Sequence, residues 1–186
     1  MKSRCGWCGD DPLYVAYHDE EWGVPVKDDN TLFEFLILET FQAGLSWITV
    51  LRKRENFRKA FDNFNYQKVA KYDDSKIEAL LKNEGIIRNR LKIKAAVTNA
   101  QAFMEIQKEF GSFSNYIWGF VGGKPIKNEL KSLKDAPATT PLSDTISKDL
   151  KKRDFKFVGS TVVYAHMQAT GMVNDHLIDC FRYHEV

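Results

Sequence analysis

Apolar residues recur at helical spacing along most of the chain, and this pattern predicts a mostly helical protein. The clearest case starts near Asn30, a suitable N-cap residue, and ends at Gly44. At 100° per residue, one face of this helix carries Leu32, Phe33, Leu36 and Ile37. The sequence therefore predicts a helix that starts near residue 30, stops before Gly44 and has one buried face.

Glu39 lies on the buried face of this helix, because it follows Leu32 by seven residues and Leu36 by three. A carboxylate on such a face is costly unless it has a partner or a function. Two interpretations are open: Glu39 is bonded to a backbone donor or an arginine, or it lies in a pocket. Leu45, after the Gly44 break, is either the apolar contact of a helix cap or a wedge that projects from the turn.

Further segments with helical periodicity predict helices over residues 47–61, 75–82, 89–108, 111–121, 144–152 and 161–170, and a short helix or turn over 12–22. In the segment 47–61 the apolar positions face inward, and the charged positions that face outward are Arg52, Lys53, Arg54, Glu55 and Arg58. Residues 124–141 contain three of the five prolines and predict an extended loop. No pairing of strands is expected.

A turn containing Gly85 separates the helix of residues 75–82 from that of residues 89–108, which starts with basic residues. This order is typical of a helix-hairpin-helix motif, in which the glycine lets the backbone bend. The amide groups at the start of the second helix then bind a phosphate. An ordinary pair of antiparallel helices has the same pattern, so both interpretations are open.

Length and charge limit the possible classes of protein. A chain of 186 residues forms one domain, or two lobes that share a core. The net charge of +2 indicates no partner by itself, but three clusters of basic residues are compatible with a side that faces phosphates. There is no run of about 18 apolar residues and no apolar segment at the N-terminus, so we expect no membrane span, no signal peptide and a cytosolic location.

The three cysteines lie near the chain ends, and an odd number in a cytosolic protein argues against a disulfide framework. His176 and Cys180 are four residues apart, which would place them on one face of a helical turn. Together with Cys5 and His18 they would form a Cys2His2 set suited to structural zinc. A set that uses Cys8 in place of His18 is an alternative, and free thiols with surface imidazoles are a third interpretation.

Five longer motifs occur in order along the chain: RCGW at residues 4–7, DPLY to EWG over residues 11–23, QAGLSW at 42–47, FKFVG at 155–159 and VNDH at 173–176. Together these motifs resemble the bacterial DNA-3-methyladenine glycosylase I family. The resemblance extends from Arg4 to Cys180, nearly the whole chain.

The resemblance implies an all-α fold of the helix-hairpin-helix glycosylase superfamily. It implies a single glycosylase domain over residues 1–186 with two helical lobes and the hairpin motif near residues 75–105. A structural Zn²⁺ site would join residues 1–20 to residues 174–182. By motif, the zinc ligands would be Cys5, His18, His176 and Cys180, which leaves Cys8 outside the site.

The resemblance also assigns the site. Glu39 would be the catalytic carboxylate, and the pocket for the base would consist of Tyr17, Trp22 and Trp47 with Trp7 nearby. Residues implied to contact DNA are Gln42, Gly44, Leu45, Gly85 and Arg88. The expected reaction is hydrolysis of the N-glycosylic bond of N3-methyladenine, flipped out of double-stranded DNA, by a monomer in the bacterial cytoplasm.

Two features depart from the wider superfamily. Related glycosylases carry an aspartate shortly after the hairpin motif, where this chain has Asn99, Gln101 and Glu105. No lysine occupies the hairpin either, so we predict a monofunctional enzyme without lyase activity. Two competing hypotheses are a zinc-stabilised DNA-binding module without activity and a zinc hydrolase, which would need an open coordination position.

Overall fold

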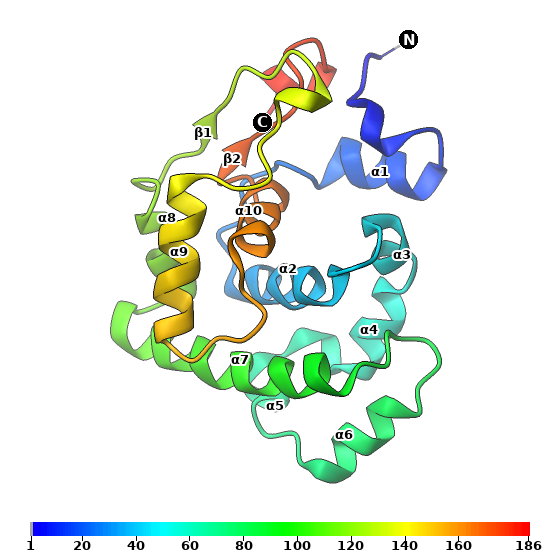
Figure 1. The fold of residues 1–186 in the computed structure, drawn as a ribbon, viewed down its shortest axis with the longest axis vertical. Helices are drawn as coiled ribbons and strands as arrows, with labels where there is room; N and C mark the ends of the chain where they lie inside the picture. Colours follow the sequence, from blue (N-terminus) through cyan, green and yellow to red (C-terminus); the bar gives the residue numbers. More distant parts are fainter. Residues whose placement is uncertain (1) are drawn as a thin grey trace.

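The structure is a computed structural model that describes residues 2–186, and helices make up most of it (Figure 1). This confirms the mostly helical fold class. Within the described residues, no helix is both long and apolar enough to cross a membrane. The longer elements are α1 (Pro12–Glu20), α2 (Asp29–Gln42), α3 (Trp47–Arg52), α4 (Arg54–Ala60), α5 (Tyr66–Val69), α6 (Asp74–Leu81), α7 (Arg90–Phe110), α8 (Phe113–Gly119), α9 (Pro141–Lys152) and α10 (Ser160–Ala169).

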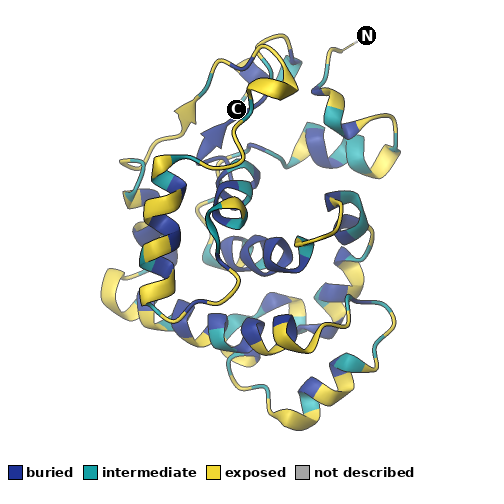
Figure 2. Cartoon of the chain, in the orientation of Figure 1, coloured by how far each residue is buried: buried dark blue, intermediate teal, exposed yellow. Residues whose placement is uncertain are grey.

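The helix α2 is the centre of the core, and Figure 2 shows most of it in the colour of buried residues. From Leu32 to Phe41, every residue except Glu34 is buried. The helix starts at Asp29 and the N-cap is Asp28, whose side chain accepts the Thr31 amide at 2.8 Å. The prediction of Asn30 as the N-cap is therefore wrong by two residues. Burial on all sides means that Glu39 and Thr40, the polar residues between Leu36 and Phe41, lie inside the protein.

The helices α2 and α7 run in opposite directions one above the other in Figure 1. Asp29, the first residue of α2, accepts hydrogen bonds from Gln107 near the end of α7 and from the backbone amides of Phe113 and Ser114 at the start of α8. One carboxylate therefore fixes the start of α2 to two other helices.

The predicted helix over residues 47–61 is in fact two helices, because α3 ends at Arg52 and α4 begins at Arg54. The break at Lys53 shifts the helical phase and turns Arg54 inward. Arg54 is only 7% exposed, and it donates hydrogen bonds to Glu21 at 2.7 Å and to Glu34 at 3.0 Å. The prediction that Arg54 faces outward is therefore wrong.

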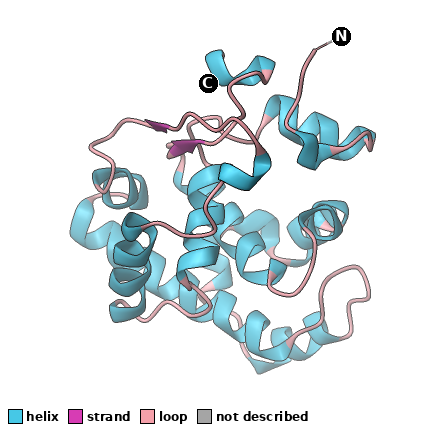
Figure 3. Cartoon of the chain, turned by 45° about the horizontal axis from the view of Figure 1, so that its top comes forward, coloured by secondary structure: helices cyan, strands magenta, loops and turns pink. Residues whose placement is uncertain are grey.

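The expectation of a loop over residues 124–141 without strand pairing is also partly wrong. The strand β1 (Ile126–Lys127) pairs in parallel with the strand β2 (Val173–Asn174). Figure 3 shows both strands in magenta. A further bridge joins Leu130 to Leu177. Strands of two residues have no visible period, so the sequence pattern could not reveal them. The pairing fixes the segment 126–136 alongside the C-terminal segment.

Candidate active site and metal centre

A cavity of about 210 Å³ lies between the N-terminal segment, α2, α3 and α10. All five residues that the sequence assigns to the base pocket line it, namely Trp7, Tyr17, Trp22, Glu39 and Trp47. Tyr14, which was not assigned to the pocket from the sequence, also lines it. Gln42, predicted to contact DNA, also reaches the cavity wall.

The helix α1 presents two tyrosines to this cavity. Its N-terminus is fixed by Asp11, whose carboxylate accepts the amides of Leu13 and Tyr14. Tyr14 and Tyr17 are three residues apart and therefore share a face. Trp7 packs edge-on against Tyr14 and against Trp22, with ring centroids 5.0 Å apart in both pairs. The aromatic wall is thus a packed unit built from three separate segments.

Glu39 lies at the inner end of the cavity and is only 4% exposed. Its Oε2 has no hydrogen-bond partner among the described residues, and burial raises the pKa of this carboxyl to about 8. Neither an arginine nor a backbone amide pairs with this oxygen, so the interpretation of Glu39 as a paired structural carboxylate is wrong. The structure places it in a pocket.

Two further polar atoms in the cavity are buried without a partner, the indole nitrogens of Trp7 and Trp47. Within the described residues, buried side-chain atoms of this kind are few, and three of the four lie here. Buried polar groups are normally satisfied in folded proteins. The cavity therefore offers two donors and one carboxylate oxygen to a ligand.

A second buried carboxylate, Asp175, lines the cavity and was missed in the sequence. It is fully engaged, because it accepts hydrogen bonds from the Tyr164 hydroxyl, the Gln168 amide and the Asn128 amide. Its position beside His176 in the VNDH motif is the sequence feature that could have identified Asp175 as a site residue. Asn128 follows β1, so Asp175 also fixes the segment that brings Leu133 over the cavity.

The turn of residues 43–46 projects from the end of α2. Gly44 has a φ of +80°, which suits glycine, and Leu45 is 41% exposed. Leu45 is thus well exposed for an apolar side chain, which favours a projecting side chain over a buried capping contact. A groove beside this turn is lined by Gly44, Leu45 and residues of α10, and it shares Glu39 and Gln42 with the cavity.

The turn between α6 and α7 contains the two hairpin residues assigned from the resemblance. Arg88 is exposed. Gly85 does not need its conformational freedom here, because its φ is not positive; a Cβ at this position would approach Asn56 and Asn83 to 3.1 Å. Glycine therefore leaves room for the side chains of Asn56 and Asn83, and the expectation that its conformational freedom bends the backbone is wrong. Asn89 caps α7 by accepting the Lys92 amide.

The four predicted metal ligands Cys5, His18, His176 and Cys180 are all buried, and their ligand atoms lie within 4.8 Å of one another. This excludes free thiols with surface imidazoles. Cys8 is outside the group, with its thiol directed to the Cys5 carbonyl at 3.2 Å, so the alternative set that includes Cys8 is wrong. His176 and Cys180 do not share a helical turn, since they lie on the irregular segment after β2.

The orientation of both histidines fits a metal. His18 Nδ1 contacts Asp19 at 2.8 Å, and His176 Nε2 contacts the Trp22 carbonyl at 2.9 Å. Such contacts commonly orient metal-bound imidazoles. The other ring nitrogens face the sulfurs of Cys180 and Cys5, each at 3.5 Å. Tetrahedral zinc with bonds of about 2.3 Å to sulfur and about 2.0 Å to nitrogen separates such atoms by roughly 3.5 Å.

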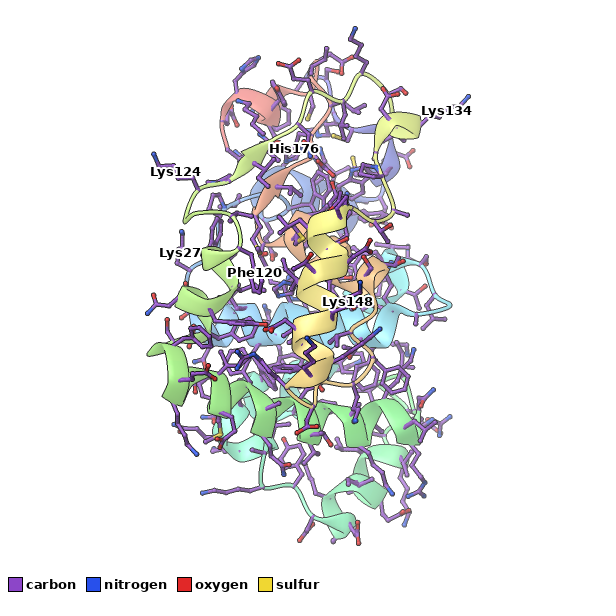
Figure 4. All side chains as sticks on the ribbon, turned by 60° about the vertical axis from the view of Figure 1, so that its left-hand side comes forward. Lys27, Phe120, Lys124, Lys134, Lys148 and His176 are labelled. Atoms are coloured by element: carbon purple, nitrogen blue, oxygen red, sulfur yellow. The ribbon has the colours of Figure 1, made fainter. Side chains whose placement is uncertain are left out.

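His176 lies inside the upper part of the molecule in Figure 4, whereas Lys124 and Lys134 extend outward at its edges. The group therefore has the donor set, the burial and the spacing to hold a metal ion. Its ligands come from both ends of the chain.

Residues 7–183 match the methyladenine glycosylase family. The chain belongs to this family. It is 49% identical over 180 residues to DNA-3-methyladenine glycosylase 1 of Escherichia coli K12, which covers 97% of this chain and 96% of the relative. It is also 49% identical over 180 residues to the DNA-3-methyladenine glycosylase of Haemophilus influenzae, with 97% of each chain covered.

Solved structures in the methyladenine glycosylase family have the same fold. A crystal structure of 3-methyladenine DNA glycosylase I matches with a TM-score of 0.94 at 51% identity, over 96% of this chain and 98% of that chain. The 3-methyladenine DNA glycosylase I of Staphylococcus aureus, a structure concerned with 3-methyladenine recognition, matches with a TM-score of 0.93 at 38% identity, over 96% and 95%.

Membership of the methyladenine glycosylase family makes the chain an enzyme, a hydrolase of N-glycosyl bonds that acts on DNA with alkylated bases. The hypothesis of a DNA-binding module without activity is therefore wrong.

Proposed function

We propose that this enzyme removes N3-methyladenine from double-stranded DNA by turning the damaged base out of the helix into the aromatic cavity. The observation that carries this proposal is the set of three buried polar atoms without partners, Glu39 Oε2 and the indole nitrogens of Trp7 and Trp47, in one cavity with aromatic walls. A planar base with polar edges satisfies such a set. The Staphylococcus aureus relative, whose structure concerns recognition of the same base, supports the choice of ligand.

The cavity selects a cation. An adenine methylated at N3 carries a positive charge while it is attached to DNA, and the faces of Tyr17 and Trp22 attract a cation by about 0.5–2 kcal/mol per good contact. The raised pKa keeps Glu39 mostly protonated at neutral pH in the empty cavity. A cationic base reverses this, because an opposite charge nearby favours the carboxylate. Normal adenine is neutral and gains neither contribution.

The chemical step needs little acid catalysis. The N-glycosylic bond breaks with its electron pair moving to the base, which leaves as neutral 3-methyladenine. The sugar becomes positively charged in the transition state, and the Glu39 carboxylate stabilises that charge in a cavity shielded from water. Water then adds to the sugar and loses a proton. Among the described residues no lysine lines the cavity, which fits an enzyme without lyase activity.

The DNA side of the site lies beside the cavity. Leu45 on the 43–46 turn would fill the space that the flipped base leaves, with Gln42 next to it. Gly85 and Arg88 lie on the hairpin before α7, whose first amides would hold a phosphate. One hydrophobic cluster contains residues from α2, α7 and α10, which supports action as a single domain; this domain would act as a monomer.

Zinc is the metal that the Cys2His2 group would hold, and its role would be structural. None of the four ligands lines the cavity, so the metal would take no part in the reaction, in contrast to the zinc hydrolase hypothesis. Trp7 and Leu177 both line the cavity and lie within two residues of a ligand. A bound metal would therefore fix two parts of the cavity wall.

The test is to incubate the purified protein with alkylated duplex DNA and to identify the released bases by chromatography. Release of 3-methyladenine, abolished or strongly reduced by Glu39→Gln, supports the proposal. The DNA strand should remain uncut at the abasic site until alkali is added. A folded protein that releases no 3-methyladenine contradicts the proposal, and a strand cut without alkali contradicts the monofunctional mechanism.

A further inference from the structure

The C-terminal end of α2 depends on a residue from α7. A helix leaves its last carbonyl groups without partners, and here the backbone leaves the helical conformation at Ala43. The Lys92 ammonium group donates to the Phe41 carbonyl at 3.2 Å and to the Ala43 carbonyl at 3.1 Å. Lys92 thus supplies, through its side chain, a cap for the end of α2.

The same contacts hold the 43–46 turn. The structure gives this turn few other anchors: Gly44, Leu45 and Ser46 are exposed, and no atom lies within 4 Å of where a Gly44 Cβ would be. The Leu45 amide bonds back to the Gln42 carbonyl at 2.7 Å. Of the contacts to the 43–46 turn from outside α2 and α3, the bond from Lys92 to Ala43 is charge-assisted, and such bonds are the stronger kind.

We propose that Lys92 is a positioning residue for base excision, which fixes the 43–46 turn so that Leu45 enters the DNA at the place where the damaged base leaves. This proposal rests on the proposed function, in particular on the wedge role of Leu45. Lys92 lies three residues after the cap of α7, so it joins the end of α7 that would hold a phosphate to the turn that would enter the helix. Lys92 thereby fixes the position of Leu45 relative to the site at the start of α7 that would bind the phosphate.

Lys92 differs from a lysine that binds phosphate. It is only 7% exposed, and its ammonium group is directed to two protein carbonyls. Its neighbour Lys94 on the same helix is exposed. A phosphate contact contributes to the salt dependence of DNA binding by about one unit of slope, whereas a buried positioning residue contributes none.

The experiment compares Lys92→Met and Lys92→Arg with Lys108→Met, which removes an exposed lysine of the same helix, paired with Glu105. Single-turnover rates are measured with alkylated duplex DNA, together with KM, the salt dependence of binding to undamaged duplex, and the affinity for free 3-methyladenine from tryptophan fluorescence. Thermal unfolding shows which variants are folded.

For Lys92→Met we expect a single-turnover rate lower by about tenfold to a hundredfold, the size of effect that a misplacement of about 1 Å produces. Its affinity for free base and its salt slope should match the wild type, and Lys92→Arg should recover much of the rate. Lys108→Met should behave as wild type. If Lys92→Met does not fold, the single-turnover rates of Lys92→Arg and Lys92→Gln are compared with that of the wild type instead.

Three results would overturn the inference: an unchanged rate for folded Lys92→Met, a salt slope reduced by about one unit with the rate loss confined to KM, or a parallel loss of free-base affinity. The first would leave the proposed function intact, because the wild type would still excise. Absence of excision by the wild type would instead contradict the proposed function itself.

Discussion

The rings of Tyr17 and Trp47 lie with their centroids 5.7 Å apart and their planes tilted by 45°. At this separation two aromatic rings are in direct contact, so no base fits between them. A base in the cavity must therefore meet the edge or the outer face of this pair. The Trp47 indole nitrogen, which is buried without a partner, is then a donor available to the base.

Replacement of Trp47 by Phe should lower kcat/KM for excision about tenfold, because it keeps a ring in place but removes one hydrogen bond worth roughly 1–1.5 kcal/mol. Trp118→Phe is the matched control, since the Trp118 indole nitrogen donates to the Val26 carbonyl outside the cavity. This control should lose stability and keep its activity. Equal activity losses in the two variants would argue against a role of the Trp47 donor.

Glu39 should make the stability of the protein depend on pH. Its folded-state pKa of about 8 lies above the ordinary value of 4.5, so the folded state holds a proton that the unfolded state has released. The contribution is complete below about pH 4.5 and is lost as the pH rises to about 8, at up to ~1.4 kcal/mol per pH unit. In urea unfolding, the free energy of the wild type should fall over this window relative to that of Glu39→Gln.

Glu129→Gln is the control for this measurement, because Glu129 is exposed. Its curve should follow that of the wild type. Parallel curves for wild type and Glu39→Gln would mean that the Glu39 carboxyl is not held protonated in the folded protein.

Substitutions of Cys180 and of Cys8 should differ in their effect on zinc content and melting temperature. We expect about one zinc ion per wild-type chain, and a loss of zinc and a lower melting temperature for Cys180→Ser or after chelation, because a structural metal contributes directly to folding. Cys8→Ser should retain zinc, since its thiol points away from the group. Elemental analysis with thermal unfolding measures both. Loss of zinc from Cys8→Ser would disprove the assignment of ligands.

Arg54 and Arg52 are two residues apart but should differ in their effect on stability. Arg54→Met leaves the mostly buried Glu34 with Arg58 as a remaining partner and should lower the free energy of unfolding by about 1.5–3 kcal/mol. Arg52 pairs with Asp11 at the surface, where solvent screens the charges, and Arg52→Met should lower the free energy of unfolding much less. Denaturant titration compares them, and equal effects would contradict the buried network.

Leu45→Ala should slow excision from duplex DNA and leave the affinity for free 3-methyladenine unchanged, because the side chain would act on the DNA and not in the cavity. Leu13→Ala is the control, since Leu13 is exposed to a similar extent, 44% against 41%. Single-turnover kinetics and base titration decide the matter. A wild-type rate for Leu45→Ala would remove the wedge from the mechanism.

The periodicity of the sequence could predict where Glu39 points, because one long helix with a clear apolar face fixes the direction of every side chain on it. Periodicity gave the wrong direction for Arg54, because the break at Lys53 between α3 and α4 changes the helical phase. It also failed for Asp175 and Leu133, which reach the cavity through two-residue strands and turns. Ligand chemistry suggested a Cys/His group, but the residue types alone left the choice between His18 and Cys8 open, and the family resemblance decided it.

The metal group joins Cys5 to His176, 171 residues further along the chain. During synthesis Cys5 and His18 leave the ribosome long before His176 and Cys180 do. Trp7 and Leu177 stand on opposite sides of this junction and both line the cavity. A nascent chain that has not yet reached Leu177 therefore lacks part of the cavity wall and half of the Cys2His2 group, although it already contains α2, α7 and α10.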